Sequence, residues 1–395
     1  MFQHKKVVLA ITGGIAVYRV AELARLLMRQ GAQVRCVMTA SACEFVTPLT
    51  FEALTGEAVH TELFNLTHER NMGHIALARW ADAVVVTPAS ANILAKLAHG
   101  IADDLLTTMV QVCDVPLMLA PAMNPSMWQS AATQNNIHLV QQRGWHVLPP
   151  TSGVLACGEE GAGRLPEPEA IAEALLPVLH KPVLQGQRWV INAGPTVEAW
   201  DAVRVLSNRA SGDLGVALAR VAAAYGADVC LIAGGGRVAQ TAEHIQRIEV
   251  MTALQMYDAC MDNAVGADVF IATAAVSDFR FADVQQDKMK RGDTTHLSVD
   301  LCVNPDVVAA VASMSERPNK VIAFAAESQH HLDYAQEKLH KKKVDAVVVN
   351  DVANMGSDVA GGWWLTAHGH QTLPAASKQA WAKKIIQATM GLETI

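Results

Sequence analysis

The sequence predicts an α/β protein with two doubly wound domains, each built on a mainly parallel β-sheet. Short apolar runs of strand length alternate with segments whose apolar residues recur at helical spacing, which is typical of parallel sheets covered by helices. The same order of strand, glycine turn, helix and strand occurs in both halves of the chain. The 395 residues exceed one ordinary domain, and 51% hydrophobic residues suffice for a sizeable core in each half.

The first half opens with a short apolar run, residues 7–11, which ends at a glycine pair and is predicted to be a buried strand. Residues 17–30 carry apolar side chains at helical spacing and are followed by Gly31, which predicts a helix that ends there. Polar turns separate the later apolar runs of this half. Further strands are expected at residues 33–39, 83–87 and 115–120.

The second half repeats this order. Residues 189–193 are predicted to be a strand that ends at a Gly-Pro-Thr turn, and residues 214–225 are predicted to be a helix that ends at Gly226. Further strands are expected at residues 229–233 and 269–273.

The boundary between the halves is expected near residue 184. Residues 177–187 lack a hydrophobic period and contain two prolines and a glycine, a composition typical of a linker. The predicted domains are therefore residues 1–183 and residues 184–395.

Composition and charge argue against several classes of protein. The formal net charge is −7 and no block has a sustained excess of Lys and Arg, so a nucleic-acid partner is not expected. Seven cysteines form an odd number without a Cys-x-x-Cys pair, which argues against a disulfide framework and a structural zinc site. No apolar run approaches the ~20 residues of a membrane span. The run at residues 7–11 is too short for a signal peptide, so a cytoplasmic protein without a membrane partner is expected.

Glycines and small polar residues follow four predicted strands of the first half, at residues 13–14, 39–41, 87–92 and 121–124. Ligands of open α/β sheets bind outside the carboxyl ends of the strands. A glycine turn before a helix also presents backbone N–H groups and the positive end of the helix dipole to a phosphate. The four turns are therefore expected to line one crevice.

Six segments of the first half occur in the order and spacing of the homo-oligomeric flavin-containing cysteine decarboxylases, which this half resembles. They are TGGIA (12–16), MTASA (38–42), GHIAL (73–77), TPASAN (87–92), PAMNPSMW (121–128) and GVLACGEEGAGRL (153–165). The resemblance covers residues 5–175 and implies a flavodoxin-like flavoprotein domain with FMN as cofactor.

The resemblance implies oxidative decarboxylation of 4′-phosphopantothenoylcysteine, with FMN as the redox group. His74 would be the catalytic base, Asn124 would hold the substrate carboxylate, and Cys157 would protonate the enethiol product. Arg164 would engage the substrate phosphate from a glycine-rich flap at residues 151–165. The residues matched to FMN are Gly13, Gly14, Ile15, Thr39, Ser41, Thr87, Ser90, Ala91 and Asn92, and Met123 is matched to the substrate.

Seven segments of the second half resemble the phosphopantothenate–cysteine ligase domain. They are AGPT (193–196), LSNRASGDLG (206–215), AAVSDF (274–279), KMK (288–290), NPDVV (304–308), FAAE (324–327) and NDV (350–352). The resemblance spans residues 189–366 and implies a Rossmann-like nucleotide-binding fold. Such a domain activates the carboxylate of 4′-phosphopantothenate with CTP, as an acyl-cytidylate, and then transfers it to the amine of cysteine.

This chemistry requires cations around a triphosphate and hydrogen-bond donors around a mixed anhydride. By the resemblance Lys288 would contact the phosphates, as would Lys338 and Lys342, which are four residues apart and so share a helix face. Asn208 would act in the turnover of the acyl-cytidylate. The triphosphate implies Mg2+, for which the sequence indicates no set of ligands. The other residues matched to the nucleotide and substrate are Ala272, Thr273, Ala274, Asp278, Pro305, Asp306, Val307, Val308 and Phe324.

Three positions depart from the ligase pattern. Val197 and Asp213 stand where Arg and Lys are usual, and Ala360 stands where an asparagine is expected. One alternative is therefore an active FMN-dependent decarboxylase half joined to a ligase-like half that is impaired or serves only as a binding or scaffold module. A second is a decarboxylase for another cysteine-ended substrate, such as a peptide. An NAD-dependent oxidoreductase is disfavoured because the glycines at 234–236 lack the GxGxxG spacing.

The resemblance also implies self-association into a homo-oligomer, in which decarboxylase trimers are joined through ligase dimers. In that family the flavin and substrate sites lie between subunits, so an isolated monomer is expected to be inactive. The other expected partners are small molecules: 4′-phosphopantothenate, cysteine, CTP and 4′-phosphopantothenoylcysteine.

Overall fold

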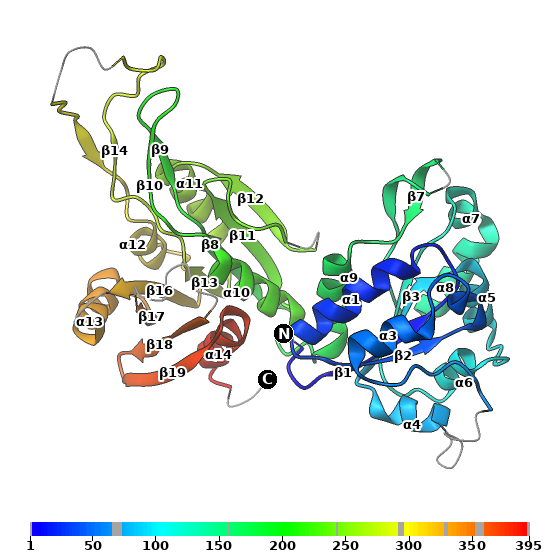
Figure 1. Cartoon of the computed structure of the whole chain (residues 1–395). Coiled ribbons are helices and arrows are strands. Elements are labelled where there is room, and N and C mark those ends of the chain that lie inside the picture. The colour runs from blue at the N-terminus through cyan, green and yellow to red at the C-terminus, as the bar shows by residue number, and fades with distance from the viewer. Residues whose placement is uncertain are drawn as a thin grey trace. The chain divides into compact units, whose positions relative to one another are not determined.

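The chain forms two compact units, Met1–His180 and Lys181–Ile395, each with its own sheet (Figure 1). The computed structural model describes residues 2–64, 73–156, 158–241, 244–290, 296–327, 331–351 and 359–392. Within these residues no helix has the length and apolar character needed to cross a membrane.

The first unit contains a five-stranded sheet with the order β2-β1-β3-β4-β5, in which every pairing is parallel. This order is that of a flavodoxin-like doubly wound sheet, whose ligand lies where the order reverses, between β1 and β3. The predicted fold class is confirmed for this unit. The strands are β1 (Lys6–Ile11), β2 (Gln33–Met38), β3 (Ala83–Ala89), β4 (Leu117–Pro121) and β5 (His146–Val147).

Helices cover both faces of this sheet. The buried residues of the first helix recur every three or four positions, from Val17 to Leu27, and that helix packs against the last helix of the unit. Side chains of α4, α5, α6 and α8 join the core around Val8 and Val84. The helices are α1 (Val17–Arg29), α2 (Ala40–Cys43), α3 (Pro48–Thr55), α4 (Gly73–Trp80), α5 (Ala91–His99), α6 (Leu105–Gln111), α7 (Pro125–Gln129), α8 (Ala131–Gln142) and α9 (Pro168–Leu179).

The predicted glycine-rich flap is an antiparallel hairpin of β6 (Thr151–Val154) and β7 (Glu160–Arg164). The hairpin lies against α7, and the chain continues from it into α9. The two strands of the hairpin therefore lie beside the end of β4, from which α7 follows.

The second unit contains an eight-stranded sheet with the order β12-β11-β8-β13-β16-β17-β18-β19. Pairing is parallel from β12 to β17 and antiparallel for the last two strands. Numbered along the chain, the parallel part has the Rossmann order 3-2-1-4-5-6, and its order reverses between β8 and β13. The strands are β8 (Arg188–Ala193), β11 (Asp228–Gly234), β12 (Gln246–Val250), β13 (Val269–Ala272), β16 (Lys320–Glu327), β17 (Ala346–Asp351), β18 (Val359–Thr366) and β19 (Gly369–Ser377).

Two helix layers enclose this sheet. Side chains from α11, α12 and α13 join one core cluster with those of the central strands, whereas α10 and α14 pack together and contact β8, β11, β18 and β19. Trp381 of α14 is fully buried and donates its indole N–H to the carbonyl of Leu373 at 3.4 Å. The helices are α10 (Asp213–Ala224), α11 (Ala253–Ala264), α12 (Val307–Ala312), α13 (His331–Lys342) and α14 (Lys378–Met390).

Two antiparallel strand pairs project from the body of this unit (Figure 1). One consists of β9 (Val197–Ala199) and β10 (Val205–Ser207), and the other of β14 (Phe279–Phe281) and β15 (Leu301–Val303). They lie side by side, because Trp200 and Phe281 stack with ring centroids 5.8 Å apart.

The observed elements differ from the sequence prediction mainly at their ends. β3 continues through Pro88 to Ala89, which the sequence places in a turn, because its pairing with β4 extends to Pro121. α9 continues through Pro177 to Leu179, so the first residues of the expected linker are helical. Proline lacks the N–H that a residue in the last turn donates, so it usually marks the end of a helix, and the sequence prediction therefore ended this helix before the structure does.

Candidate active sites

The first unit has a cavity of about 860 Å³ at the point where its strand order reverses. The turn after β1 and the turn after β3 form one side, and the β4–α7 connection and the β6–β7 hairpin form another. Eight of the sequence-predicted residues line it: Gly13, Gly14, Ile15, Ser90, Ala91, Met123, Asn124 and Arg164.

A hydroxyl ties the two turns together. Thr12 Oγ1 donates to the carbonyl of Pro88 at 2.5 Å and accepts the backbone N–H of Ser90 at 3.1 Å. Ser90 in turn caps α5, since its hydroxyl accepts the N–H of Ile93. The buried threonine therefore fixes the glycine turn of β1 against the N-terminus of α5.

Gly13 is required by close packing. A Cβ at this position would lie 2.5 Å from the Cβ of Ser41, at the start of α2. The adjacent Gly14 has no neighbouring atom within 4 Å of such a Cβ. At Gly13 the neighbouring Ser41 leaves no room for a side chain, whereas the space beside Gly14 is open toward the cavity.

The β6–β7 hairpin closes against the residues that follow β4. The N–H of Met123 donates to the carbonyl of Gly163 at 3.0 Å, and a Cβ on Gly163 would lie 2.1 Å from the carbonyl oxygen of Met123. Asn124 donates from Nδ2 to the carboxylate of Glu159 at 2.7 Å, while its Oδ1 accepts the N–H of Ser126. The Asn124 amide therefore already holds a carboxylate, supplied here by the protein itself.

Two arginines at the cavity share one carboxylate. Arg164 donates to Glu167 at 3.1 Å, and Arg19 of α1 pairs with the same carboxylate and also donates to the carbonyl of Leu165 at 3.1 Å. This arrangement anchors the base of the hairpin to α1 and keeps cationic groups on the cavity wall.

Five other predicted residues of this unit that the structure describes lie off the cavity wall. Thr39 caps α2, Ser41 packs against Gly13, and Asn92 is exposed in the first turn of α5. Thr87 is completely buried, and among the described residues its hydroxyl has no hydrogen-bond partner. His74 lies half-buried in the first turn of α4, and Cys157 lies outside the described residues.

The cavity fits the flavin that the sequence motifs imply. Its volume is in the range of small-molecule sites, which are lined mainly by apolar side chains with a few polar groups. Ile15, Met127 and Leu155 provide apolar surface for a planar ring system. The open glycine turn at the N-terminal end of α1 provides backbone for a phosphate.

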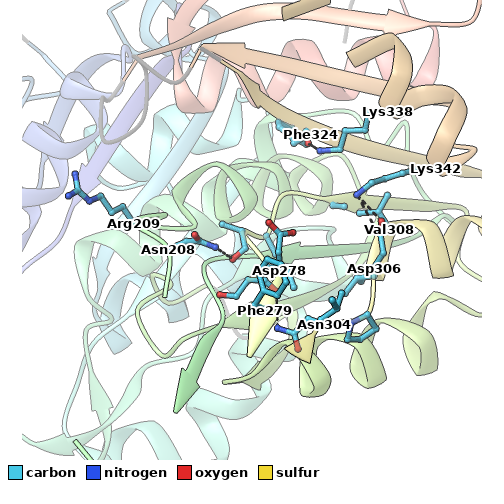
Figure 2. Close-up of a pocket in the computed structure, with 18 residues that line it drawn as sticks. Asn208, Arg209, Asp278, Phe279, Asn304, Asp306, Val308, Phe324, Lys338 and Lys342 are labelled. Carbon is cyan, nitrogen blue, oxygen red and sulfur yellow. Dashed lines mark hydrogen bonds and ion pairs between the residues drawn. The ribbon is translucent and has the colours of Figure 1, made fainter. Parts of the chain in front are cut away.

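The second unit has a cavity of about 1060 Å³, again beside the point where the strand order reverses. It brings together the segments that follow β10, β13 and β15, Phe324 of β16 and two lysines of α13 (Figure 2). The predicted residues that line it are Asn208, Ala272, Ala274, Asp278, Pro305, Asp306, Val307, Val308, Phe324, Lys338 and Lys342.

Buried groups of β8 hold the loop that follows β13. Asn192 is 1% exposed, and its Oδ1 accepts the N–H of Ala274 at 3.0 Å while its carbonyl accepts the hydroxyl of Thr273 at 2.6 Å. Thr273 therefore supports the cavity wall instead of lining it. A Cβ on Gly215 would lie 2.4 Å from that of Ala193, so this glycine lets α10 pack directly on the end of β8.

The two lysines of α13 lie on the same side of the cavity, opposite Asn208 and Asp278 (Figure 2). Lys338 Nζ donates to the carbonyl of Phe324 at 2.5 Å, and Lys342 Nζ lies 3.1 Å from the carboxylate of Asp306. Asp306 also caps α12 through the N–H of Ala309. Both ammonium groups are thus held at the wall by protein acceptors that an anionic ligand can replace.

Asn208 Nδ2 donates to the carbonyl of Ala275 at 2.9 Å, which joins the loop after β10 to the loop after β13. Lys288 is exposed on the segment after β14 and does not line the cavity. The structure therefore brings together the residues matched to the nucleotide, with Lys288 and Thr273 as the exceptions.

The three departures from the ligase pattern also lie off the cavity wall. Val197 bonds through its N–H to the carbonyl of Met251, and Ala360 is buried in β18 opposite Ala376. Asp213 forms an ion pair with Lys378 at 2.8 Å, and this lysine, together with the hydroxyl of Ser211, lowers the pKa of the Asp213 carboxyl.

Carboxylates are sparse around both cavities. Across the part of the chain that the structure describes, no three His, Cys, Asp or Glu side chains gather as a metal site. In the second cavity Asp278 and Asp306 provide carboxylates. Mg2+ commonly binds one or two carboxylates together with substrate phosphates, so these two side chains fit a metal that arrives with a triphosphate.

Several cavity residues escaped the sequence analysis. Tyr18, Arg19 and Met127 line the first cavity, and Arg209 and Asn304 line the second. Arg209 and Asn304 lie inside motifs used for the resemblance, next to Asn208 and Pro305. That proximity in sequence could have identified them as residues of the cavity. Tyr18 and Arg19 belong to an amphipathic helix, and the sequence does not indicate which turn of that helix faces a ligand.

Comparisons with known proteins match both units. The family model described as Flavoprotein matches residues 1–180, and that described as DNA/pantothenate metabolism flavoprotein C-terminal domain matches residues 184–392. The coenzyme A biosynthesis bifunctional protein CoaBC of Vibrio cholerae is 40% identical over 389 residues, which cover 97% of each chain. The protein of the same name from Haemophilus influenzae is 42% identical and covers 97% of this chain and 96% of its own length. That from Bacillus subtilis is 38% identical, with 99% and 98% covered.

Solved structures resemble each unit separately. The C-terminal domain of a CoaBC protein is 30% identical, with a TM-score of 0.46, and covers 53% of this chain and 96% of its own. The FMN-dependent cysteine decarboxylase SpaF is 32% identical, with a TM-score of 0.39, and covers 45% of this chain and 99% of its own.

Proposed function

The chain belongs to the family of bifunctional coenzyme A biosynthesis flavoproteins, and we propose that the two cavities are the sites of its two reactions. It is a bifunctional enzyme, a phosphopantothenate–cysteine ligase and a phosphopantothenoylcysteine decarboxylase. We assign the decarboxylase to residues 1–183, with FMN as cofactor, and the CTP-dependent ligase to residues 184–395.

In the decarboxylase site FMN would lie against the turns at residues 13–15 and 90–92, with Thr39, Ser41 and Thr87 behind them. When bound, it supplies the hydride acceptor and donor of the reaction. Asn124 holds the substrate carboxylate by exchanging its present acceptor, Glu159, for the substrate.

The remaining groups of this site act on protons and on the phosphate. His74 serves as the base for the oxidative step, and Cys157 returns a proton to the enethiol. Arg164 binds the substrate phosphate from the hairpin, beside Arg19, and Met123 contacts the substrate chain.

In the ligase site the triphosphate of CTP replaces the carbonyl of Phe324 and the carboxylate of Asp306 as the partner of Lys338 and Lys342. These ammonium groups stabilise charge that develops on the leaving pyrophosphate, and the motif match assigns Lys288 to the same phosphates. Mg2+, held by the cavity carboxylates together with the phosphates, would supply further positive charge there. Asp278 and the turn at residues 305–308 recognise the nucleoside. Asn208, on the opposite side of the cavity, orients the acyl-cytidylate for attack by the cysteine amine.

The observation that carries this proposal is the composition of the second cavity. Motifs that are up to 134 residues apart, at Asn208 and Lys342, line one space of about 1060 Å³ with cations on one side and an amide on the other. A ligase needs this combination, whereas a scaffold module does not.

A single reaction tests both assignments. The full chain is mixed with 4′-phosphopantothenate, cysteine, CTP and Mg2+, the products are identified by mass spectrometry, and the visible spectrum of the protein is recorded. We expect a flavin spectrum, CMP and 4′-phosphopantetheine. A flavin spectrum with decarboxylation of added 4′-phosphopantothenoylcysteine, but without CMP, would support the alternative of an impaired ligase half.

We also propose that the decarboxylase site is completed by a second copy of the chain in a homo-oligomer. Support comes from His74, which does not line the cavity of its own unit, and from the exposed apolar side chains Ile15, Tyr18 and Met127 at that cavity. Light scattering combined with activity measurement tests this, and an active monomer would contradict it.

A further inference from the structure

Asn304 forms the centre of a buried polar network at the wall of the ligase cavity. It is 7% exposed and lies between the end of β15 and the Pro305 turn. Its backbone N–H donates to the carbonyl of Asp278 at 2.8 Å, and its Nδ2 donates to the carbonyl of Ser277 at 2.8 Å. One residue thus binds two successive carbonyls of the opposite segment.

The orientation of the Asn304 amide is fixed from its other side. Arg280 donates from one guanidinium nitrogen to Asn304 Oδ1 at 3.1 Å and to the carbonyl of Val303 at 2.7 Å. Since arginine can only donate, the amide oxygen must face Arg280 and the amide nitrogen must face Ser277. No other orientation of the side chain satisfies both partners.

The network also reaches the loop after β8. The N–H of Ser277 donates to Thr196 Oγ1 at 2.9 Å, and the carbonyl of Thr196 accepts the hydroxyl of Ser207, the residue before Asn208. Ser277 and Thr196 are 7% and 0% exposed, so these groups have little access to water. A buried polar group that loses its partner is costly, and the segment is therefore held in one conformation.

Asp278 follows the buried Ser277, and its own side chain is exposed and lines the cavity. Because Asn304 holds the carbonyls of both Ser277 and Asp278, it sets the direction in which the Asp278 side chain leaves the backbone. Asn304 also places the Pro305–Val308 turn at a fixed distance from Asp278, since its own backbone starts that turn.

We infer that Asn304 is a positioning residue of the nucleotide site, which acts through Asp278 to set the affinity for the nucleoside triphosphate. This inference deepens the proposed ligase function and rests on it. Removal of the Asn304 side chain should weaken nucleotide binding as long as Asp278 is present, because the carboxylate then samples orientations that do not meet the ligand.

The test is a double-mutant cycle on the full chain, read as the Kd of CTP with Mg2+ by titration calorimetry. The variants are Asn304→Ala, Asp278→Ala and the double variant. We expect Asn304→Ala to weaken CTP binding by about tenfold in the wild-type background and by less than about twofold in the Asp278→Ala background. If the fold-changes in Kd of the two single variants multiply in the double variant, the two residues act independently and the inference is overturned.

Two further variants separate positioning from a general loss of stability. Asn304→Asp keeps the size and the acceptor for Arg280 but faces the Ser277 carbonyl with a carboxylate, so we expect weakened binding even where Asn304→Ala fails to fold. Thr389→Val removes a buried hydroxyl that bonds to Ile385 within α14 and should lower the Tm without changing the Kd of CTP. An equal loss of affinity in Thr389→Val would overturn the inference.

The wild-type titration distinguishes this inference from the proposed function. Wild-type protein that does not bind CTP would overturn the ligase assignment and the inference with it. If the wild type binds CTP but the fold-changes in Kd of the two single variants multiply in the double variant, the ligase assignment stands and only the role of Asn304 is overturned.

Discussion

The two glycines at positions 13 and 14 are adjacent in the sequence but differ in their surroundings. Gly13 has Ser41 against it, whereas Gly14 faces open space. A sequence motif shows glycine at both positions. It does not distinguish a glycine that close packing requires from one that leaves space for a ligand.

We expect Gly13→Ala to lower the free energy of unfolding by about 1–3 kcal/mol, because the new Cβ overlaps Ser41 and the backbone must move. The displaced turn should also lower the flavin content after purification. Gly14→Ala is the matched control for stability and should unfold like the wild type. Chemical denaturation and the ratio of flavin to protein absorbance measure both effects, and equal stability of the two variants would contradict the explanation.

The ion pair between Asp213 and Lys378 predicts a pH-dependent contribution to stability. The pKa of Asp213 is lowered in the folded protein, chiefly by Lys378, so the contribution is present above the unfolded value of about 3.9 and is lost as the pH falls through the lower folded value. The carboxylate side chain is 47% exposed, which limits the effect to below about 1 kcal/mol. The free energies of unfolding of wild type and Asp213→Asn, measured in urea, should differ at pH 6. The difference should shrink as the pH falls from the unfolded value of about 3.9 through the lower folded value. A difference that stays constant across this range would assign the effect to another cause.

At the scale of elements, the packing of a helix or hairpin on its neighbours positions the functional side chains that it carries. α13 presents Lys338 and Lys342 one turn apart, and the helix is placed beside the cavity by its packing on β16 and β17. The β6–β7 hairpin is placed by backbone contacts to Met123, so its position depends on glycine at the contact.

We expect Gly163→Ala to reduce decarboxylase turnover at least about tenfold, because a Cβ 2.1 Å from the Met123 carbonyl oxygen displaces the hairpin from the site. Ligase activity of the same protein should remain, which provides an internal control. Gly153→Ala is a matched variant, since its φ of 156° resembles the 155° of Gly163 but its nearest neighbour atom is 3.8 Å away. Equal losses in the two variants would assign the effect to backbone strain and not to the close contact.

At the scale of the whole molecule, the chain consists of two units with separate cores. Leu184 is fully buried and its N–H donates to the carbonyl of Tyr225 at 2.8 Å, so the residues just before β8 belong to the second core. The boundary between the two folding units therefore lies before Leu184.

We expect fragments 1–180 and 181–395 to fold separately, with flavin bound to the first and acyl-cytidylate formation in the second. A fragment that starts at Arg188 lacks the buried Leu184 and should be less stable than fragment 181–395 by about 2 kcal/mol. Denaturation midpoints of the two C-terminal fragments measure this. Equal midpoints would mean that Leu184 contributes little to the second core.

The sequence by itself determined the fold class and the family. Apolar runs and helical spacing are local properties, so the strands at 7–11 and 189–193 and the helices at 17–30 and 214–225 were found within a few residues of their observed bounds. The residues named from the sequence include eight that line the first cavity and eleven that line the second.

Only the tertiary structure decided which motif residues meet. The resemblance matches Lys288 and Thr273 to the ligand just as it matches Lys338 and Ala274. Lys288 and Thr273 nevertheless lie off the cavity wall, because Lys288 is on the segment after β14 and the hydroxyl of Thr273 donates to the carbonyl of Asn192. The role of Asn304 likewise depends on Arg280 and Ser277, partners that are 24 and 27 residues away. A pattern along the chain reports periodicity and turn chemistry, whereas the partners of a buried polar group are set by sheet order and packing, which bring distant segments together.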